Sequence, residues 1–127
     1  MAPITASFAA IIGAMLTALA INTTRVRLRS GREPTPEATE AIRRASRAHG
    51  NALEHGLPVL LLMFFAETHG AAHLGLCVVG TLFVIARVFH AYGMLTRPRS
   101  LPMRIGAGST YALEIVLLNL LVVALLG

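Results

Sequence analysis

The residues of this 127-residue chain that are most suited to chemistry lie in two short groups, each on one face of a predicted helix. Arg47, Asn51 and Glu54 are spaced i, i+4 and i+7, and Arg87 and His90 are spaced i and i+3. Side chains at these spacings leave a helix in similar directions. Arginine forks bind carboxylates and amides hydrogen-bond across helices, so the two groups indicate a site for an anionic ligand.

These polar groups interrupt an unusually apolar sequence. Hydrophobic residues make up 55% of the chain and charged residues 13%, whereas soluble domains carry about a quarter charged residues. All eleven basic residues are arginine and all six acidic residues are glutamate, which gives a net charge of +5. The arginines gather in short segments between apolar stretches rather than on a soluble basic face, and this pattern argues against nucleic-acid binding.

Four apolar stretches predict an all-α integral membrane protein, a single domain built as a four-transmembrane-helix bundle. The expected spans are about residues 4–21, 45–66, 71–94 and 105–126. The first lacks the basic start of a signal peptide, so we interpret it as a retained span. The second helix is expected to begin in water at Thr35-Pro36-Glu37, which combines an N-cap, a first-position proline and an acid in the first turn, and to enter the membrane near Ala52.

The arginine distribution also predicts an orientation. Arginines concentrate in the connections at about residues 25–44 and 95–104, and the tight connection at Glu67-Thr68-His69-Gly70 has none. By the positive-inside rule, both basic connections face the cytoplasm. Both termini then lie on the opposite side of what we expect to be a bacterial inner membrane.

Two interpretations of the polar cluster stay open at this point. Ionised side chains cost about 2.5–3.5 kcal/mol at mid-bilayer on insertion scales, so Glu54 and Arg87 could form an interhelical ion pair with Asn51 bridging the helices. That pair does not explain why further arginines and His90 gather at one depth without enough carboxylates. The excess of cationic donors favours an anionic ligand.

Two other patterns are given structural rather than catalytic interpretations. His69, His73 and Cys77 have i, i+4, i+8 spacing, but no fourth ligand is nearby, so we predict no metal site. Six glycines are expected to permit close approach of the third and fourth helices: Gly70, Gly75, Gly80, Gly93, Gly106 and Gly108.

Two sequence strings carry a family resemblance. Arg47-Ala48-His49-Gly50-Asn51-Ala52-Leu53-Glu54 and Arg87-Val88-Phe89-His90 resemble the membrane-associated proteins in eicosanoid and glutathione metabolism, the MAPEG family. Its members include microsomal glutathione transferases, leukotriene C4 synthase and microsomal prostaglandin E synthase. The resemblance covers essentially the whole chain in length, span count and orientation.

The resemblance implies a homotrimer of four-helix protomers that binds glutathione as a co-substrate between neighbouring subunits, near the cytoplasmic side. It places Asn51, Glu54, Arg87 and His90 around the glutathione, with Arg47 at the entrance and Arg25 reaching the site from the first helix. It also implies that Arg104 lies beside the glutathione sulfur as the catalytic residue.

This role for Arg104 agrees with thiol chemistry. A free thiol has a pKa of about 8.5, and a fixed cation beside it favours the nucleophilic thiolate. An apolar groove between helices would admit a lipophilic electrophile from the surrounding lipid. The resemblance thus implies a glutathione transferase or peroxidase.

Departures from the family pattern narrow the expectation. Beyond Arg104 the chain lacks the Ser and Tyr of eicosanoid synthases, although Tyr111 lies one turn further, and Tyr92 is off the Arg87–His90 face. We therefore favour a bacterial-type member resembling microsomal glutathione transferases. One alternative is a non-catalytic lipid-binding or scaffold protein of the same fold. Another is a small proton-coupled exporter, for which Glu114 would supply the membrane-embedded carboxylate.

Overall fold

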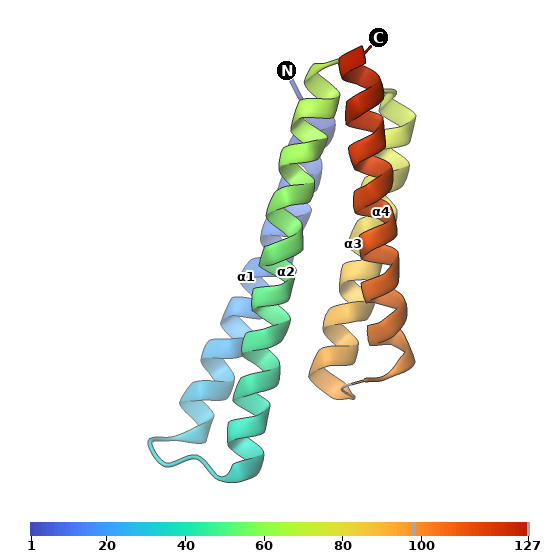
Figure 1. Cartoon of the computed structure of the whole chain (residues 1–127). Helices are drawn as coiled ribbons and strands as arrows, with labels where there is room; N and C mark the ends of the chain where they lie inside the picture. The colour runs from blue at the N-terminus through green and yellow to red at the C-terminus, as the bar shows by residue number, and fades with distance from the viewer. Residues whose placement is uncertain (98, 127) are drawn as a thin grey trace.

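The computed structural model describes residues 1–97 and 99–126, which form four long helices joined by short connections. These helices are α1 (Pro3–Ser30), α2 (Pro36–Thr68), α3 (His73–Thr96) and α4 (Leu101–Leu126). They run up and down in one bundle, with both termini at one end and the connections α1–α2 and α3–α4 at the other (Figure 1). The expected all-α architecture is confirmed.

The start of α2 follows the predicted capping pattern. The Thr35 side chain accepts a hydrogen bond from the Ala38 amide at 3.3 Å, and Pro36 occupies the first helical position. Glycines with positive φ form the turns on either side of this helix: Gly31 at +69° and Gly70 at +84°. These backbone conformations strain any residue with a Cβ, so glycine suits both turns.

The connections are shorter than the sequence suggested. Much of the segment 25–44 is helical, because α1 continues to Ser30 and only residues 31–35 separate it from α2. The second basic connection is likewise reduced, because α4 begins at Leu101. Arginine is a good helix former, so a basic segment leaving the apolar region need not end a helix. The arginines therefore lie largely on helical extensions rather than in loops.

The apolar core lies toward the end of the bundle that holds the termini. Each helix contributes a large buried side chain: Ile12 from α1, Met63 from α2, Phe83 from α3 and Leu117 from α4. The two helical hairpins, α1–α2 and α3–α4, each pack along their length, and α2 contacts both helices of the second hairpin.

Three of the six glycines permit close helix approach, as expected. A Cβ on Gly93 would lie 2.7 Å from the Met103 backbone, and one on Gly106 would lie 2.7 Å from the Ala86 carbonyl oxygen. A Cβ on Gly80 would lie 2.6 Å from the Phe8 ring. Gly108 has open space instead, and Gly70 lies in the turn before α3.

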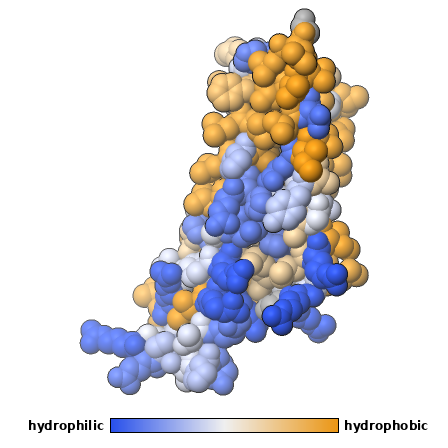
Figure 2. Space-filling model, in the orientation of Figure 1, coloured by the Kyte–Doolittle hydropathy of each residue, from blue (hydrophilic) through white to orange (hydrophobic). Residues whose placement is uncertain are grey.

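The helices present the surface of a membrane protein. Among the described residues α1, α3 and α4 are long and apolar enough to cross a bilayer. The 33-residue α2 is polar in its first half and mostly apolar from Ala52 onward, and the span predicted at about residues 45–66 lies within this helix. Hydrophobic side chains cover the upper part of the bundle and hydrophilic ones gather at its lower end (Figure 2).

One buried carboxylate ties the two ends of the first hairpin together. Glu67 is 7% exposed and accepts hydrogen bonds from the amides of Ile4 and Thr5 at 2.9 and 2.7 Å, and from the Thr5 hydroxyl at 2.7 Å. Ala2 offers no side-chain cap to α1. Glu67 therefore satisfies amides at the start of α1 that have no partner within that helix.

Candidate functional site

The centre of the predicted site is a fully buried arginine. Arg87 of α3 is 1% exposed, and its Nη2 donates to Asn51 Oδ1 of α2 at 2.7 Å. Its Nη1 lies 3.4 Å from the Thr110 hydroxyl of α4, which donates in turn to the Gly106 carbonyl at 2.7 Å. Arg87 thus joins three helices and leaves its Nε–H without a partner among the described residues.

His90 lies one turn further along α3 and is also buried. Its Nδ1 is 2.9 Å from the Met103 carbonyl oxygen, so Nδ1 carries the proton and donates. The opposite nitrogen, Nε2, is buried and has no hydrogen-bond partner among the described residues. His90 is held close to α4 because Gly106 has no side chain to separate the helices.

A cavity of about 330 Å³ opens beside Asn51 and holds three of the predicted residues. It lies along α2 and is bounded on one side by Met94 of α3. Its lining residues are Ser46, Arg47, Gly50, Asn51, Glu54 and Met94. Arg47 and Glu54 are exposed side chains of opposite charge on this cavity, and neither has a salt-bridge partner among the described residues.

Four predicted residues do not line this cavity: Arg25, Arg87, His90 and Arg104. Arg25 is exposed on the last turns of α1, and Arg104 is exposed on the first turn of α4. Within one chain, the structure brings Arg47, Asn51 and Glu54 together and links them to Arg87 through the Asn51 amide. Arg25 and Arg104 do not line the same cavity.

The MAPEG family model matches residues 5–125, which is nearly the whole chain. The chain belongs to the MAPEG family. Neither curated proteins nor solved structures give a further match. Family membership covers all four helices, so the motifs on α2 and α3 lie within the matched region.

In this MAPEG protein the alternative ion pair between Glu54 and Arg87 does not form. Arg87 bonds to Asn51 and Thr110 instead, and Glu54 points out of the bundle. At 3.6 residues per turn, Glu54 is rotated by about 60° from Asn51 around α2, whereas His55 is rotated by about 40° in the other sense. The spacing in the sequence predicts that Glu54 lies close to Asn51 on α2, but it does not predict which of the two side chains faces α3.

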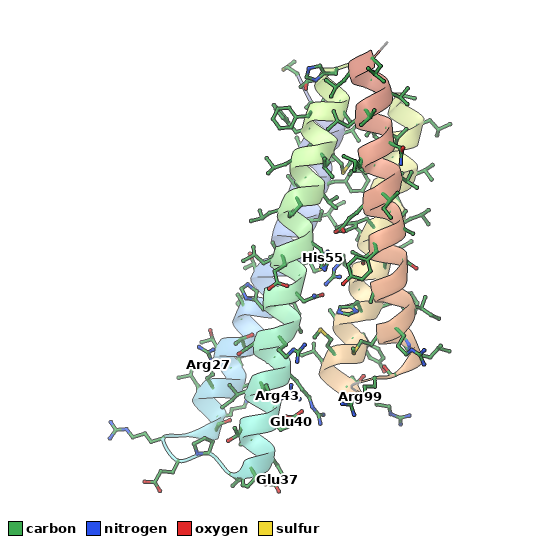
Figure 3. All side chains as sticks on the ribbon, in the orientation of Figure 1. Arg27, Glu37, Glu40, Arg43, His55 and Arg99 are labelled. Carbon is green, nitrogen blue, oxygen red and sulfur yellow. The ribbon has the colours of Figure 1, made fainter. Side chains whose placement is uncertain are left out.

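His55 is the polar residue that the sequence analysis missed. Its Nδ1 lies 2.7 Å from Glu114 Oε1 of α4, and its ring makes an edge-to-face contact with Tyr111 at a centroid distance of 5.4 Å. In Figure 3 His55 points from α2 into the space between the hairpins. Glu114, the carboxylate considered for proton-coupled export, is therefore paired. The partners are 59 positions apart in the sequence, so no local signal predicts this contact.

The histidines near the apolar end make no cluster. His69 Nδ1 is 2.8 Å from the Phe65 carbonyl oxygen, which closes the end of α2, and Cys77 is exposed on α3. Across residues 1–97 and 99–126, no three His, Cys, Asp or Glu side chains are placed to share a metal ion.

Proposed function

We propose that this MAPEG protein binds glutathione in the cavity beside Asn51. The observation that carries the proposal is that Arg47 and Glu54, which have opposite charges, line one cavity. The Asn51 side chain of the same cavity is held by a hydrogen bond from the buried Arg87. The γ-glutamyl end of glutathione carries an ammonium and a carboxylate close together. A carboxylate and an arginine fork on one wall match that pair of charges.

Assembly as a homotrimer supplies the rest of the proposed site. Arg25 and Arg104 do not reach the cavity of their own chain, and both are exposed. A neighbouring copy packed against α2 would bring such residues to the open side of the cavity. The basic end of the bundle would face the cytoplasm, where glutathione is available, by the positive-inside rule.

Arg104 is the residue we propose to stabilise the glutathione thiolate. It lies on α4 between Met103 and Ile105. Ile105 lines an apolar groove of about 670 Å³ between α3 and α4, whereas Met103 faces the arginine-rich end of the bundle. On this proposal, Arg104 holds the glutathione thiol near the groove through which the lipophilic electrophile enters. The thiolate sulfur would attack the electrophilic carbon, form the carbon–sulfur bond and expel the leaving group or yield an adduct that takes up a proton.

Calorimetry of glutathione with the detergent-purified protein tests the site. We expect the variants Arg47→Gln and Glu54→Gln to weaken binding at least about tenfold, because each removes one charge-assisted contact. Glu33→Gln, at an exposed position between α1 and α2, is the matched control and should bind normally. Equal glutathione binding by the unmodified protein and all three variants would contradict the proposal. Native mass spectrometry in a mild detergent tests the trimer.

A non-catalytic member of the family is the second candidate, and the size of the apolar groove favours it. The groove between α3 and α4 is about twice the volume of the polar cavity and is large enough for an acyl chain. On this alternative, Arg104→Ala leaves ligand binding unchanged and no glutathione conjugate forms with an electrophile such as 1-chloro-2,4-dinitrobenzene. Loss of conjugation in Arg104→Ala, with glutathione still bound, supports the transferase.

A further inference from the structure

A second, larger cavity lies at the basic end of the bundle, between α2 and the α3–α4 connection. Its volume is about 600 Å³, and four arginines and one glutamate line it. Arg43, Arg44 and Arg47 come from α2, and Arg99 comes from the connection. Figure 3 shows Glu40 and Arg43 on α2, with Arg99 across the gap at the end of the other hairpin.

The glutamate in this cavity is already used by two of the arginines. Glu40 accepts from Arg43 Nε and Nη2 at 2.7 Å each and from Arg44 Nε at 2.9 Å. These hydrogen bonds from Arg43 and Arg44 lower the pKa of Glu40 to about 2, so it is ionised at neutral pH. One carboxylate against four arginines leaves the cavity with three net positive charges. Glu40 also holds the forks of Arg43 and Arg44 in place.

Glutathione does not account for this excess of charge. It carries one net negative charge at neutral pH, and the motif residues Arg47 and Glu54 already match its charged end. Without Arg47, the three remaining arginines against Glu40 still leave two net positive charges. Arg43, Arg44 and Arg99 lie outside both family strings. Their planar forks suit an oxyanion with several oxygens, and arginine binds phosphate in two-pronged fashion.

The depth of the cavity points to the membrane surface. Arg47 and Arg44 precede Ala52, where the apolar part of α2 begins, by five and eight residues. At 1.5 Å per residue these positions lie about 8 and 12 Å beyond the apolar region, which is the outer edge of the headgroup layer and the water just beyond it. Met94 and Met103 form the apolar part of the lining and adapt readily to an alkyl or glycerol group.

We propose that this arginine cavity binds the phosphate of an anionic ligand, with the headgroup of an anionic phospholipid as its source. Basic pockets at the ends of membrane helices attract such headgroups, and each cation near the surface adds to the attraction. The site adjoins the cavity beside Asn51, with which it shares Arg47 and Met94, and differs from it in Arg43, Arg44 and Arg99.

Calorimetry with soluble short-chain lipids tests this proposal on the full chain in a neutral detergent. Dihexanoylphosphatidylglycerol is the anionic probe, dihexanoylphosphatidylcholine the zwitterionic one, and inorganic phosphate the soluble source. We expect phosphatidylglycerol to bind more tightly than phosphatidylcholine, and Arg43→Gln and Arg99→Gln to weaken it by roughly tenfold to a hundredfold each. Arg29→Gln and Arg32→Gln, exposed arginines at the same end but outside the cavity, should stay within about twofold.

The other possible outcomes either assign the phosphate site to a soluble ligand or overturn it. Inorganic phosphate binding as tightly as the lipid, with the same loss in Arg43→Gln and Arg99→Gln, supports the phosphate site and assigns it to a soluble ligand. Equal losses in Arg29→Gln and Arg43→Gln would show non-specific attraction to a basic surface and overturn the proposal. No binding of any probe would overturn it as well. Thermal unfolding of each variant confirms that it is folded.

Discussion

Two buried charged residues in different parts of the bundle, Glu67 and Arg87, differ in how fully their hydrogen bonds are satisfied. Glu67, near the termini, accepts three hydrogen bonds from α1. Arg87, toward the basic end, donates to Asn51 at 2.7 Å, lies 3.4 Å from Thr110, and leaves its Nε without a described partner. A charge kept only for stability has its hydrogen bonds satisfied, because an unpaired buried polar group is costly. The unsatisfied Nε of Arg87 fits the proposed ligand site at the end that holds the charged cavities.

The largest effect is expected when the Arg87 charge is removed and the side-chain volume is kept. Arg87→Met should reduce glutathione binding by at least about a hundredfold, because a buried charge that anchors Asn51 is lost. Thermal stability should stay the same or rise, since replacing a buried charge by an apolar side chain is often neutral or stabilising. Calorimetry and thermal unfolding measure the two effects. Val88→Met, on the exposed face of α3, is the control. Normal binding with a large loss of stability would give Arg87 the same structural role as Glu67.

The converse is expected for Glu67. Glu67→Ala should lower the free energy of unfolding by about 2–4 kcal/mol, because α1 loses the group that accepts its first amides. Glutathione binding by the folded protein should not change. Thr68→Ala, at the exposed neighbouring position, is the control and should have a small effect. Unfolding in detergent with increasing denaturant measures the stability of both variants. A weakened glutathione affinity in Glu67→Ala would contradict a purely structural role for Glu67.

A smaller effect tests how closely α3 and α4 must pack around Arg87 and His90. Gly106→Ala places a Cβ 2.7 Å from atoms of Ala86 and His90 and should destabilise the protein by about 1–3 kcal/mol. Gly108→Ala, on the same helix with nothing within 4 Å, should instead be neutral or stabilise by about 0.5–1 kcal/mol. Thermal unfolding of both variants provides the comparison. Equal behaviour would mean that the close approach at Gly106 does not hold the site together.

The smallest expected effect concerns the surface of the basic end. The hydrogen bonds from Arg43 and Arg44 lower the folded-state pKa of Glu40 to about 2 from an ordinary value of 4.5. The stabilisation is therefore complete above pH 4.5 and is lost as the pH falls toward 2. Thermal unfolding between pH 6 and 2 should show a small loss that is absent in Glu40→Gln and reduced by salt. A pH dependence identical in both proteins would contradict this role for Glu40.

Local sequence signals predicted much of the fold. Thr35 and Pro36 mark the start of α2 by rules that involve only neighbouring residues, and the structure places the helix start there. Helix α1 runs past the predicted span of residues 4–21 to Ser30, because arginines signal departure from the membrane but do not break a helix. The amino-acid composition therefore predicts where the chain leaves the membrane better than it predicts where a helix ends.

The site was less predictable, since it depends on contacts between distant helices. The helical face of Arg47, Asn51 and Glu54 was visible in the sequence, and all three line one cavity. The partner of Arg87 was not, because a difference of about 60° around α2 decides whether Asn51 or Glu54 faces α3. The pair of His55 with Glu114 had no local signal at all.

The carboxylate of Glu67 also has a consequence for biogenesis. It is synthesised 63 residues after Ile4, one of the amides that it binds. The first turn of α1 is therefore completed only when the end of α2 reaches the same face of the bilayer. This order favours insertion of α1 and α2 as a hairpin. A nascent chain arrested before Glu67 would hold α1 in the membrane with its first amides still open.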